Sequence, residues 1–321
     1  MRAALISEYQ APPSLVERDD PPAAEGKAML ELRAAALNVA DLAIASGTFP
    51  AGSPPLPYVP GIEGVGTVVH SGRFSPGTRV WASGRGLGVA TDGSLSERFA
   101  VSDEVLVEVP EGVDDMIAAA LGVVGLAAWL PLSWLARVRP GESVLVLGAT
   151  GAVGSIAVQA AKILGAGRVV AAGRDASRLE RARELGADAV VALEGDELAA
   201  RLIAAFAGAP PSVVFDPLWG PPLEAAIAAA APGARIVHLG QSAGPIAALL
   251  SGLVRGKQLQ ILGYSNFAVP QDAVAEGYRD LLDHAAAGRI RIDVEAIPLK
   301  GIAEAWARQS RAAGTKLVLV P

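Results

Sequence analysis

The sequence predicts an α/β protein in which a doubly wound parallel sheet is joined to a β-rich domain. Three observations support this fold class. The 321 residues are more than one hydrophobic core usually holds, so two domains are expected. The first part of the chain consists of short apolar or alternating runs separated by clusters of Gly, Pro and Ser. After Pro140, short hydrophobic runs alternate with longer helical patterns.

Short strands are expected throughout the β-rich part, where the many loops indicate antiparallel pairing. These strands are residues 1–7, 29–34, 63–70, 78–82 and 97–101. The strands of the parallel sheet are expected at residues 143–147, 168–172, 189–193, 213–215, 235–239 and 259–263. A last strand, residues 316–320, can rejoin the first domain.

The composition excludes several kinds of function. The chain has no cysteine, which excludes disulfides, thiolate catalysis and cysteine-ligated zinc or iron–sulfur sites. The formal net charge is −6, and no basic stripe offers a surface for nucleic acid or anionic lipid. Small molecules are therefore the expected partners. No apolar run long enough for a signal peptide precedes Glu8, so a cytoplasmic location is expected.

One uncharged stretch, residues 116–136, is long enough to span a bilayer. Gly122, Gly125 and Pro131 interrupt it. Such residues break a helix that a folded core can accept as two shorter ones. We therefore expect a buried segment between the domains, with a membrane helix as the alternative.

Three glycines, Gly148, Gly151 and Gly154, follow the first strand of the parallel sheet. A helical pattern over residues 152–164 and a second strand come next, which is the framing that a dinucleotide-binding turn requires. Glycines let the backbone approach a pyrophosphate, and free N–H groups with the helix dipole favour its negative charge. A turn without a ligand is the alternative. The expected binding residues of the turn are Gly148, Thr150, Gly151, Ala152, Val153 and Gly154.

The end of the second strand favours NADPH over NADH. An NAD site needs an acidic residue about 20 residues after the glycines to bind the ribose 2′-hydroxyl. Gly173 stands at that point, and Arg174 and Arg178 follow it, which suits a 2′-phosphate. Asp175 is the one opposing group, and it fits the N-cap of the next helix. A solvated helix start is the alternative interpretation of the two arginines.

Several stretches resemble, in order and spacing, the medium-chain dehydrogenase/reductase superfamily, and within it the zinc-free quinone oxidoreductase-like branch. These stretches are ALNVADLAIASGTFP, PGIEGVGTVV, GSLSERFAV, GATGAVGS, RARELGAD, VVFDPLWG and GTKLVLV. The resemblance covers almost the whole chain. It implies a GroES-like catalytic domain formed by residues 1–120 and 264–321, and a Rossmann NADPH-binding domain formed by residues 121–263.

Some features of this superfamily are missing. Asn38 occupies the position of the first zinc-ligating cysteine and Ile62 that of the histidine, so no metal is expected. Phe49 stands where relatives have a tyrosine that is proposed to donate a proton. Ala43 and Ala127 replace a tyrosine and a threonine near the cofactor. A more apolar substrate pocket is therefore expected.

The resemblance also implies roles for polar residues that are present. Asn38 and Asp41 are placed near the nicotinamide end of the cofactor, and Gln241 and Ser242 near its ribose and carboxamide. Arg178 is placed near the 2′-phosphate. These positions are expectations carried over residue by residue.

The implied function is zinc-independent, NADPH-dependent transfer of hydride to a quinone or another conjugated carbonyl (enone). Such a substrate delocalises the developing oxyanion, which then needs only modest hydrogen bonding. Tyr264 and Asn266 are candidate donors to it beside Asn38, with packing at the domain joint or at a subunit interface as the alternative. A non-catalytic NADPH-sensing protein and a zinc-free ketone or imine reductase also stay open. The resemblance also implies a homodimer in which the last strands of the parallel sheet pair, and residues 259–264 form an apolar strand edge that suits such pairing.

Overall fold

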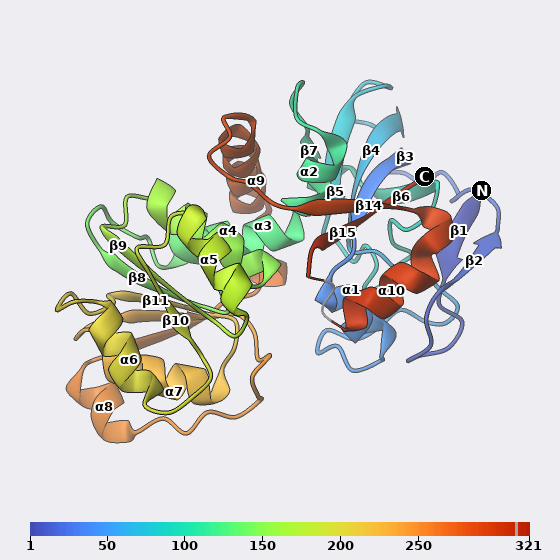
Figure 1. Ribbon diagram of the computed structural model, residues 1–321. Coiled ribbons are helices and arrows are strands. Elements are labelled where there is room, and N and C mark those ends of the chain that lie inside the picture. The colour runs from blue at the N-terminus through green and yellow to red at the C-terminus, as the bar shows by residue number, and fades with distance from the viewer. Residues whose placement is uncertain (312–313) are drawn as a thin grey trace. The chain divides into compact units, whose positions relative to one another are not determined.

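The chain forms two compact units. The computed structural model describes residues 1–311 and 314–321 (Figure 1). One unit, the mixed-sheet unit, contains Met1–Val124, Ala275–Gly288 and Ile292–Pro321. The other, the parallel-sheet unit, contains Gly125–Val274 and Arg289–Arg291. The chain thus leaves the mixed-sheet unit after Val124 and returns to it at Ala275.

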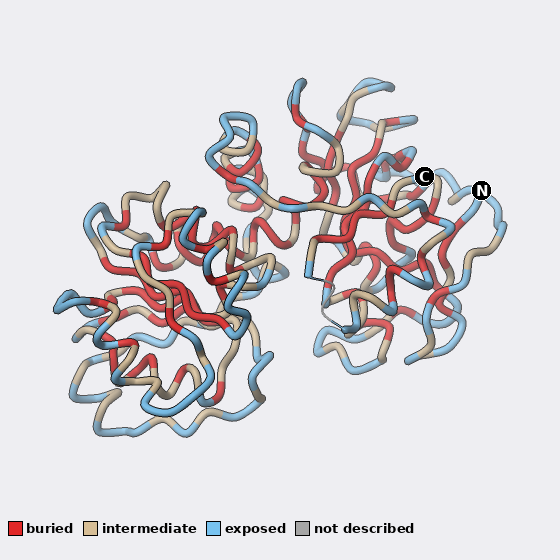
Figure 2. Tube along the Cα trace, viewed as in Figure 1, coloured by how far each residue is buried: buried red, intermediate tan, exposed pale blue. Residues whose placement is uncertain are grey.

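The parallel-sheet unit is built on six strands in the order β10-β9-β8-β11-β12-β13, all of them parallel. These strands are β8 (Ser143–Leu147), β9 (Arg168–Gly173), β10 (Ala189–Ala192), β11 (Val213–Asp216), β12 (Arg235–His238) and β13 (Gln260–Gly263). Every residue of β8 is buried, as expected for a strand with helices on both faces (Figure 2). The predicted doubly wound sheet is therefore confirmed, with small differences at the strand ends.

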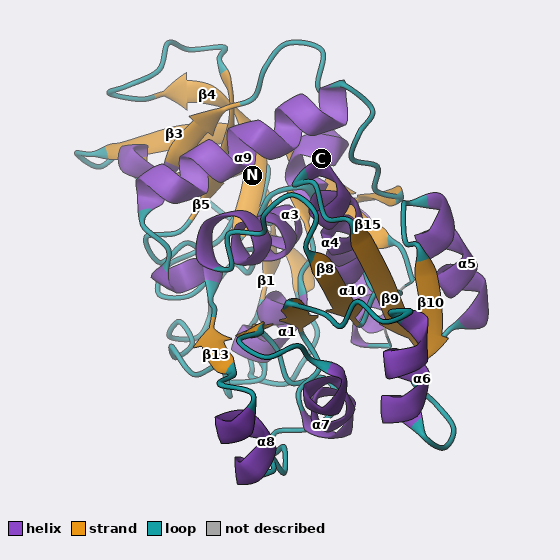
Figure 3. Ribbon diagram, turned by 90° about the vertical axis from the view of Figure 1, so that its left-hand side faces the viewer, coloured by secondary structure: helices purple, strands orange, loops and turns teal. Residues whose placement is uncertain are grey.

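Helices connect these strands. They are α4 (Ala152–Ile163), α5 (Ala176–Glu184), α6 (Leu198–Ala205), α7 (Gly220–Ala229) and α8 (Ser251–Gly256). Figure 3 shows β8, β9 and β10 side by side, and the strand order then continues on the other side of β8 with β11. The order therefore reverses between β8 and β11, which is where open α/β sheets bind their ligands.

The mixed-sheet unit contains a seven-stranded sheet in the order β14-β15-β3-β4-β5-β7, with β6 also paired to β3. Its strands are β3 (Lys27–Ala36), β4 (Glu63–His70), β5 (Arg79–Ser83), β6 (Arg98–Ser102), β7 (Leu106–Glu108), β14 (Val294–Pro298) and β15 (Lys316–Val320). A separate two-stranded sheet joins β1 (Arg2–Leu5) to β2 (Ser14–Glu17). As predicted, the last strand of the chain rejoins this unit, where it pairs with β3.

The strands in the first part of the chain pair antiparallel, as expected, but one edge of the sheet, which the C-terminal part of the chain forms, differs. β14 and β15 are parallel. The reason is that α10 (Ile302–Ser310) lies between them in the chain, and a helical crossover returns the chain in the same direction. The sequence patterns also did not indicate β2, β7, β14 or α1 (Val39–Ala45).

The long uncharged stretch forms short pieces rather than one helix. These are α2 (Asp115–Ala120), α3 (Val123–Leu130) and a π-helical turn, Pro131–Leu135. Most of these residues are buried. In the part of the chain that the structure describes, no helix has the length and apolar character needed to cross a membrane. The expected broken, buried segment is confirmed.

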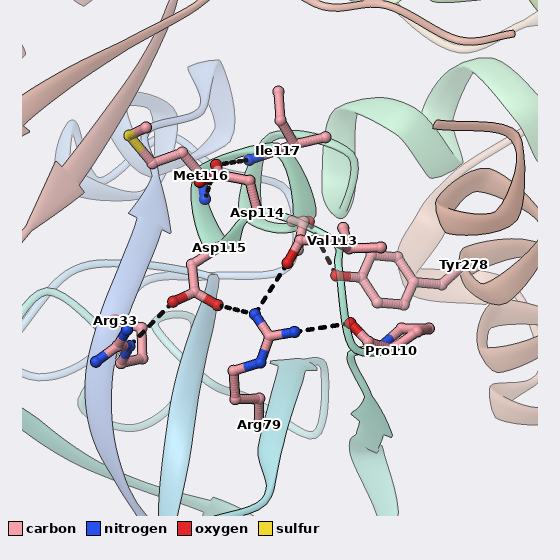
Figure 4. Close-up of polar contacts among 10 residues, drawn as sticks. Arg33, Arg79, Pro110, Val113, Asp114, Asp115, Met116, Ile117 and Tyr278 are labelled. Atoms are coloured by element: carbon pink, nitrogen blue, oxygen red, sulfur yellow. Dashed lines mark hydrogen bonds and ion pairs between the residues drawn. The ribbon is translucent and has the colours of Figure 1, made fainter. Parts of the chain in front are cut away.

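The first turn of α2 is fixed by two arginines from the sheet (Figure 4). Arg79 of β5 donates to Asp115 Oδ1 at 2.7 Å and to the carbonyl oxygens of Val113 and Pro110. Arg33 of β3 donates to the other oxygen of Asp115 at 3.0 Å. These contacts attach α2, and the chain that leads into α3, to the mixed sheet.

Candidate active site

The glycine turn lies at the carboxyl end of β8. Gly148 has a φ of +65°, in the left-handed region that glycine favours. The Gly151 N–H donates to the Gly148 carbonyl oxygen at 3.1 Å, and Gly151 is the N-cap of α4. Among the described residues, no side chain caps this 12-residue helix. The N–H groups of its first turn are therefore available to an anion.

The glycines of the turn allow close backbone contacts. A Cβ on Gly154 would lie 2.2 Å from the Gly148 carbonyl oxygen, so only glycine lets α4 pack against the turn. A Cβ on Gly173, at the end of β9, would lie 2.3 Å from Thr150 Cγ2. By contrast, a Cβ on Gly151 would meet only the Gly148 oxygen, at 3.5 Å. The chain is tightly packed below the turn and open beside Gly151, which fits the approach of a pyrophosphate.

Two arginines follow the end of β9. Arg178 donates weakly to the Thr150 carbonyl oxygen, at 3.5 Å, and its Nε lies 3.7 Å from Asp175 Oδ2. Asp175 is the N-cap of α5, where it accepts from Ser177 Oγ and from the Arg178 N–H. These hydrogen bonds, that from Ser177 foremost, hold the pKa of Asp175 below its usual value. Asp175 therefore has the capping role expected from the sequence, and Arg174 beside it is exposed.

The segment after β12 lies against the segment after β11. Ser242 Oγ donates to the Pro217 carbonyl oxygen at 3.3 Å, and a Cβ on Gly240 would lie 2.7 Å from that same oxygen. A Cβ on Gly148 would in turn meet the Pro217 ring at 3.1 Å. The structure thus brings the glycine turn together with the segment that carries Gln241 and Ser242.

Tyr264 and Asn266, the candidate hydrogen-bond donors that follow β13, contact each other. The Tyr264 hydroxyl donates to Asn266 Oδ1 at 2.7 Å, and the Leu126 carbonyl oxygen lies 3.4 Å from the same hydroxyl. Burial raises the pKa of Tyr264. The residue is therefore a neutral phenol at physiological pH and acts as a hydrogen-bond donor rather than as a base.

The sequence analysis missed a polar group at the ends of β11 and β12. Asp216 is fully buried, and its Oδ1 accepts from the N–H groups of Leu218 and Trp219. Asp216 Oδ2 lies 3.1 Å from His238 Nδ1, and the His238 ring packs on the Trp219 ring at a centroid distance of 4.1 Å. Trp219 has a φ of +58°, a conformation that is costly for a residue other than glycine. The available signal was an aspartate ending an apolar strand, in VVFDPLWG.

In the mixed-sheet unit, Asn38 and Asp41 begin α1. The Asn38 N–H donates to Asp41 Oδ2 at 2.7 Å, and the Ile62 N–H donates to Asp41 Oδ1 at 3.0 Å. Asp41 is buried, and burial, aided by the nearby Glu63, raises its pKa to about 7 against the two hydrogen bonds. The Asp41 carboxyl group therefore attaches the start of α1 to the chain before β4.

The Asn38 amide joins two charged residues that the sequence analysis missed, Glu63 and Lys316. Asn38 Nδ2 donates to Glu63 Oε1 at 2.8 Å and to the Ala36 carbonyl oxygen at 3.0 Å. Asn38 Oδ1 accepts from Lys316 Nζ at 2.6 Å, and Lys316 also donates to the Leu37 carbonyl oxygen. Both amide hydrogens of Asn38 are therefore used within the protein.

Glu63 also holds the start of α3. Its Oε2 accepts from the Val123 N–H at 2.7 Å and from Trp81 Nε1 at 3.0 Å. A Cβ on Gly122 would lie 1.9 Å from this oxygen, so glycine is required there. Tyr278 of α9 (Gln271–Ala286) stacks on Trp81, with ring centroids 4.3 Å apart. The first turn of α3 is thus joined to β4 and β5.

Burial acts in opposite directions on the two charges. It raises the pKa of Glu63, against which Lys316 and the hydrogen bond from Asn38 act. Burial lowers the pKa of Lys316, and Glu63 and Asp41 oppose that shift. Each group is therefore the main stabiliser of the charged form of the other.

The donor groups around Asn38 do not fit a zinc ion. Asn38 and Ile62, which the sequence resemblance places at two zinc-ligand positions, supply neither a thiolate nor an imidazole. The Lys316 ammonium, which repels a cation, is hydrogen-bonded to Asn38. Over residues 1–311 and 314–321, no group of three His, Cys, Asp or Glu residues is arranged to hold a metal ion.

A doubly wound sheet with a glycine turn at its point of reversal, together with a separate mixed-sheet unit, defines a class of two-domain oxidoreductases. Matches to protein families agree with this class. Residues 24–111 match the alcohol dehydrogenase GroES-like domain, and residues 152–284 match the zinc-binding dehydrogenase family. The chain belongs to the medium-chain dehydrogenase/reductase superfamily, is quinone oxidoreductase-like, and is an oxidoreductase.

Individual relatives support this assignment. The chain is 32% identical over 259 residues to a quinone oxidoreductase of Pseudomonas aeruginosa, covering 78% of this chain and 77% of that one. Two solved structures match all of this chain and all of their own. They are the quinone oxidoreductase of Thermus thermophilus, solved also with NADPH (29% identity, TM-score 0.82), and that of Escherichia coli with NADPH (25% identity, TM-score 0.87).

Proposed function

We propose that this oxidoreductase transfers hydride from NADPH to a quinone or another conjugated carbonyl without a metal ion. The observation that carries the proposal is the uncapped N-terminus of α4 behind the Gly148–Gly154 turn, with Arg174 and Arg178 close by in the sequence at the end of β9. The relatives from Thermus thermophilus and Escherichia coli, whose structures are described with NADPH, support the choice of cofactor and substrate.

In this proposal, three sets of groups in the parallel-sheet unit bind different parts of NADPH. The first-turn N–H groups of α4 receive the pyrophosphate, and the two arginines receive the 2′-phosphate. Gln241 and Ser242 hold the nicotinamide ribose and carboxamide. When bound, the nicotinamide supplies the hydride, and the chain has to orient it and exclude water.

The acceptor is expected to be conjugated, because the chain offers few groups that could stabilise a localised oxyanion. Phe49, which has no hydroxyl group, is partly buried against the core of the mixed-sheet unit. The Tyr264 hydroxyl is the proposed donor to the delocalised oxyanion, and to act so it has to turn its single hydrogen from Asn266 Oδ1 to the substrate. The proton that completes the reduction then comes from solvent.

The test measures oxidation of NADPH and of NADH with a panel of quinones and enones. We expect turnover with a strong preference for NADPH. Arg174→Ala and Arg178→Ala should each raise the KM for NADPH about 10-fold and leave that for NADH nearly unchanged, since each removes one contact to the 2′-phosphate. Arg183→Ala is the matched control, because Arg183 is an exposed arginine of α5, the helix that also carries Arg178, and pairs with Glu180.

Two outcomes would contradict the proposal. Equal use of NADH and NADPH would remove the assigned role of the arginines. Tight NADPH binding without oxidation by any acceptor would instead support a non-catalytic NADPH-sensing protein.

We also propose that two copies associate through β13. This strand is last in the sheet order, so its outer edge has no partner among the described strands, and Ile261 on it is 39% exposed. An exposed apolar edge favours pairing with another strand. Light scattering should give a dimer for the wild type and a monomer for Ile261→Lys. Ile203→Lys, at an exposed isoleucine of α6, is the control and should stay dimeric.

A further inference from the structure

The mixed-sheet unit keeps two opposite charges almost completely out of water. Glu63 is 0% exposed and Lys316 is 4% exposed. Burying either charge alone is strongly unfavourable, so their presence requires mutual compensation and hydrogen bonds. The Asn38 amide joins them, with its oxygen towards the ammonium and its nitrogen towards the carboxylate.

The amide can satisfy both charges in one orientation only. A rotated amide would set its hydrogens against the Lys316 ammonium and its oxygen against the Glu63 carboxylate. In the observed orientation the second hydrogen donates to the Ala36 carbonyl oxygen, so neither hydrogen is left for a ligand. Asn38 therefore acts by holding other groups in place rather than by donating to a substrate.

We propose that Lys316 is a positioning residue for the reaction, whose ammonium is the resident positive charge that keeps Glu63 ionised and holds the starts of α1 and α3. Since Asn38 stands where zinc-dependent members have a ligand, a covalently attached cation here compensates a buried carboxylate without a metal. The inference rests on the proposed function.

The contacts show what would be lost without the ammonium. An ionised Glu63 accepts three hydrogen bonds through its two oxygens, one of them from the Val123 N–H that begins α3. A protonated carboxyl group has one oxygen less to offer as a good acceptor. Lys316 also fixes the Leu37 carbonyl oxygen directly before α1. The first residue of that helix, Val39, is 74% exposed, so this network lies beneath a surface position.

The test is a double-variant cycle with Lys316→Met, Glu63→Gln and the two together. We measure denaturant unfolding and steady-state kinetics in the full-length protein. Lys316→Met should lower kcat at least 10-fold while the KM for NADPH changes less than 2-fold, because the groups proposed to bind the pyrophosphate and the 2′-phosphate lie in the other unit. The double variant should be more stable than Lys316→Met alone, because it removes the Glu63 carboxylate that Lys316→Met leaves uncompensated.

Lys27→Met is the control, since Lys27 is an exposed lysine of β3, and it should change neither quantity. Additive losses of stability, or an unchanged kcat in a folded Lys316→Met variant, would overturn the inference. If Lys316→Met does not fold, recovery of folding in the double variant supports the compensation, and failure of both overturns it. If the wild type reduces no acceptor, the proposed function fails, while the stability cycle still decides whether the two charges compensate each other.

Discussion

The two units differ in whether their key polar groups have hydrogen-bond partners within the protein. At the glycine turn of the parallel-sheet unit, the N–H groups at the start of α4 have no side-chain cap among the described residues, and Arg174 is exposed. Around Asn38 in the mixed-sheet unit, Glu63, Lys316 and Asp41 are buried and hydrogen-bonded within the protein. Polar groups without a partner in the protein are available to bind a ligand, whereas polar groups that are hydrogen-bonded within the protein stabilise the fold. Substitutions in the parallel-sheet unit should therefore mainly affect NADPH binding, and those in the mixed-sheet unit should mainly affect stability.

Gly154→Ala should have the largest effect. Its Cβ would lie 2.2 Å from the Gly148 carbonyl oxygen and 2.7 Å from the Cα of Ala149, and backbone atoms cannot move away without displacing α4. We expect a loss of about 3 kcal/mol in the free energy of unfolding, and NADPH binding weakened beyond detection by fluorescence. Gly252→Ala is the control, because nothing lies within 4 Å of its Cβ position. Normal NADPH binding by Gly154→Ala would show that the turn does not need close packing.

Gly122→Ala should have a smaller effect, confined to the closed network. Its Cβ would lie 1.9 Å from Glu63 Oε2, and the carboxylate can rotate away only by giving up its bonds to Val123 and Trp81. We expect a loss of about 2 kcal/mol in urea unfolding, with the affinity for NADPH unchanged. A weakened affinity for NADPH at unchanged stability would reverse the assignment of roles to the two units.

The pH dependence of the free energy of unfolding should reveal the raised pKa of Asp41. Its pKa is raised from 3.8 to about 7, so between these values the native protein holds a proton that the unfolded chain has released. Stability from this group is therefore present at low pH and is lost as the pH rises towards 7. Asp41→Asn, which cannot titrate, should remove this contribution. Unfolding curves of wild type and variant at several pH values check it, and parallel pH profiles would contradict it.

The sequence predicted the parallel-sheet unit well because its signals are local. Gly148, Gly151 and Gly154 follow a buried strand at once and precede a helical pattern, so the strand, turn and helix could be recognised within one stretch of chain. Periodicity marked the other strands of this sheet in the same way.

The buried network could not be predicted, because its members meet only in the folded chain. Lys316 and Asn38 are 278 residues apart in sequence, and Lys316 begins a strand that is otherwise apolar. A single charge at a strand end is usually solvated, so neither it nor Glu63 indicated an internal partner. β14 was missed for a related reason, since it is short, ends in Pro298, and depends on parallel pairing with β15.

Arg174→Ala should have the smallest effect on stability. Arg174 is exposed at the start of the segment after β9, and a group that serves a ligand contributes little to the folded chain without it. We expect the free energy of unfolding without NADPH to change by less than about 0.5 kcal/mol. Added NADPH should stabilise the wild type more than the variant, because a ligand that binds only the folded state raises stability according to its affinity. Thermal unfolding with and without NADPH measures both quantities. A large loss without NADPH would mean that this arginine, like the buried groups of the mixed-sheet unit, holds the chain itself.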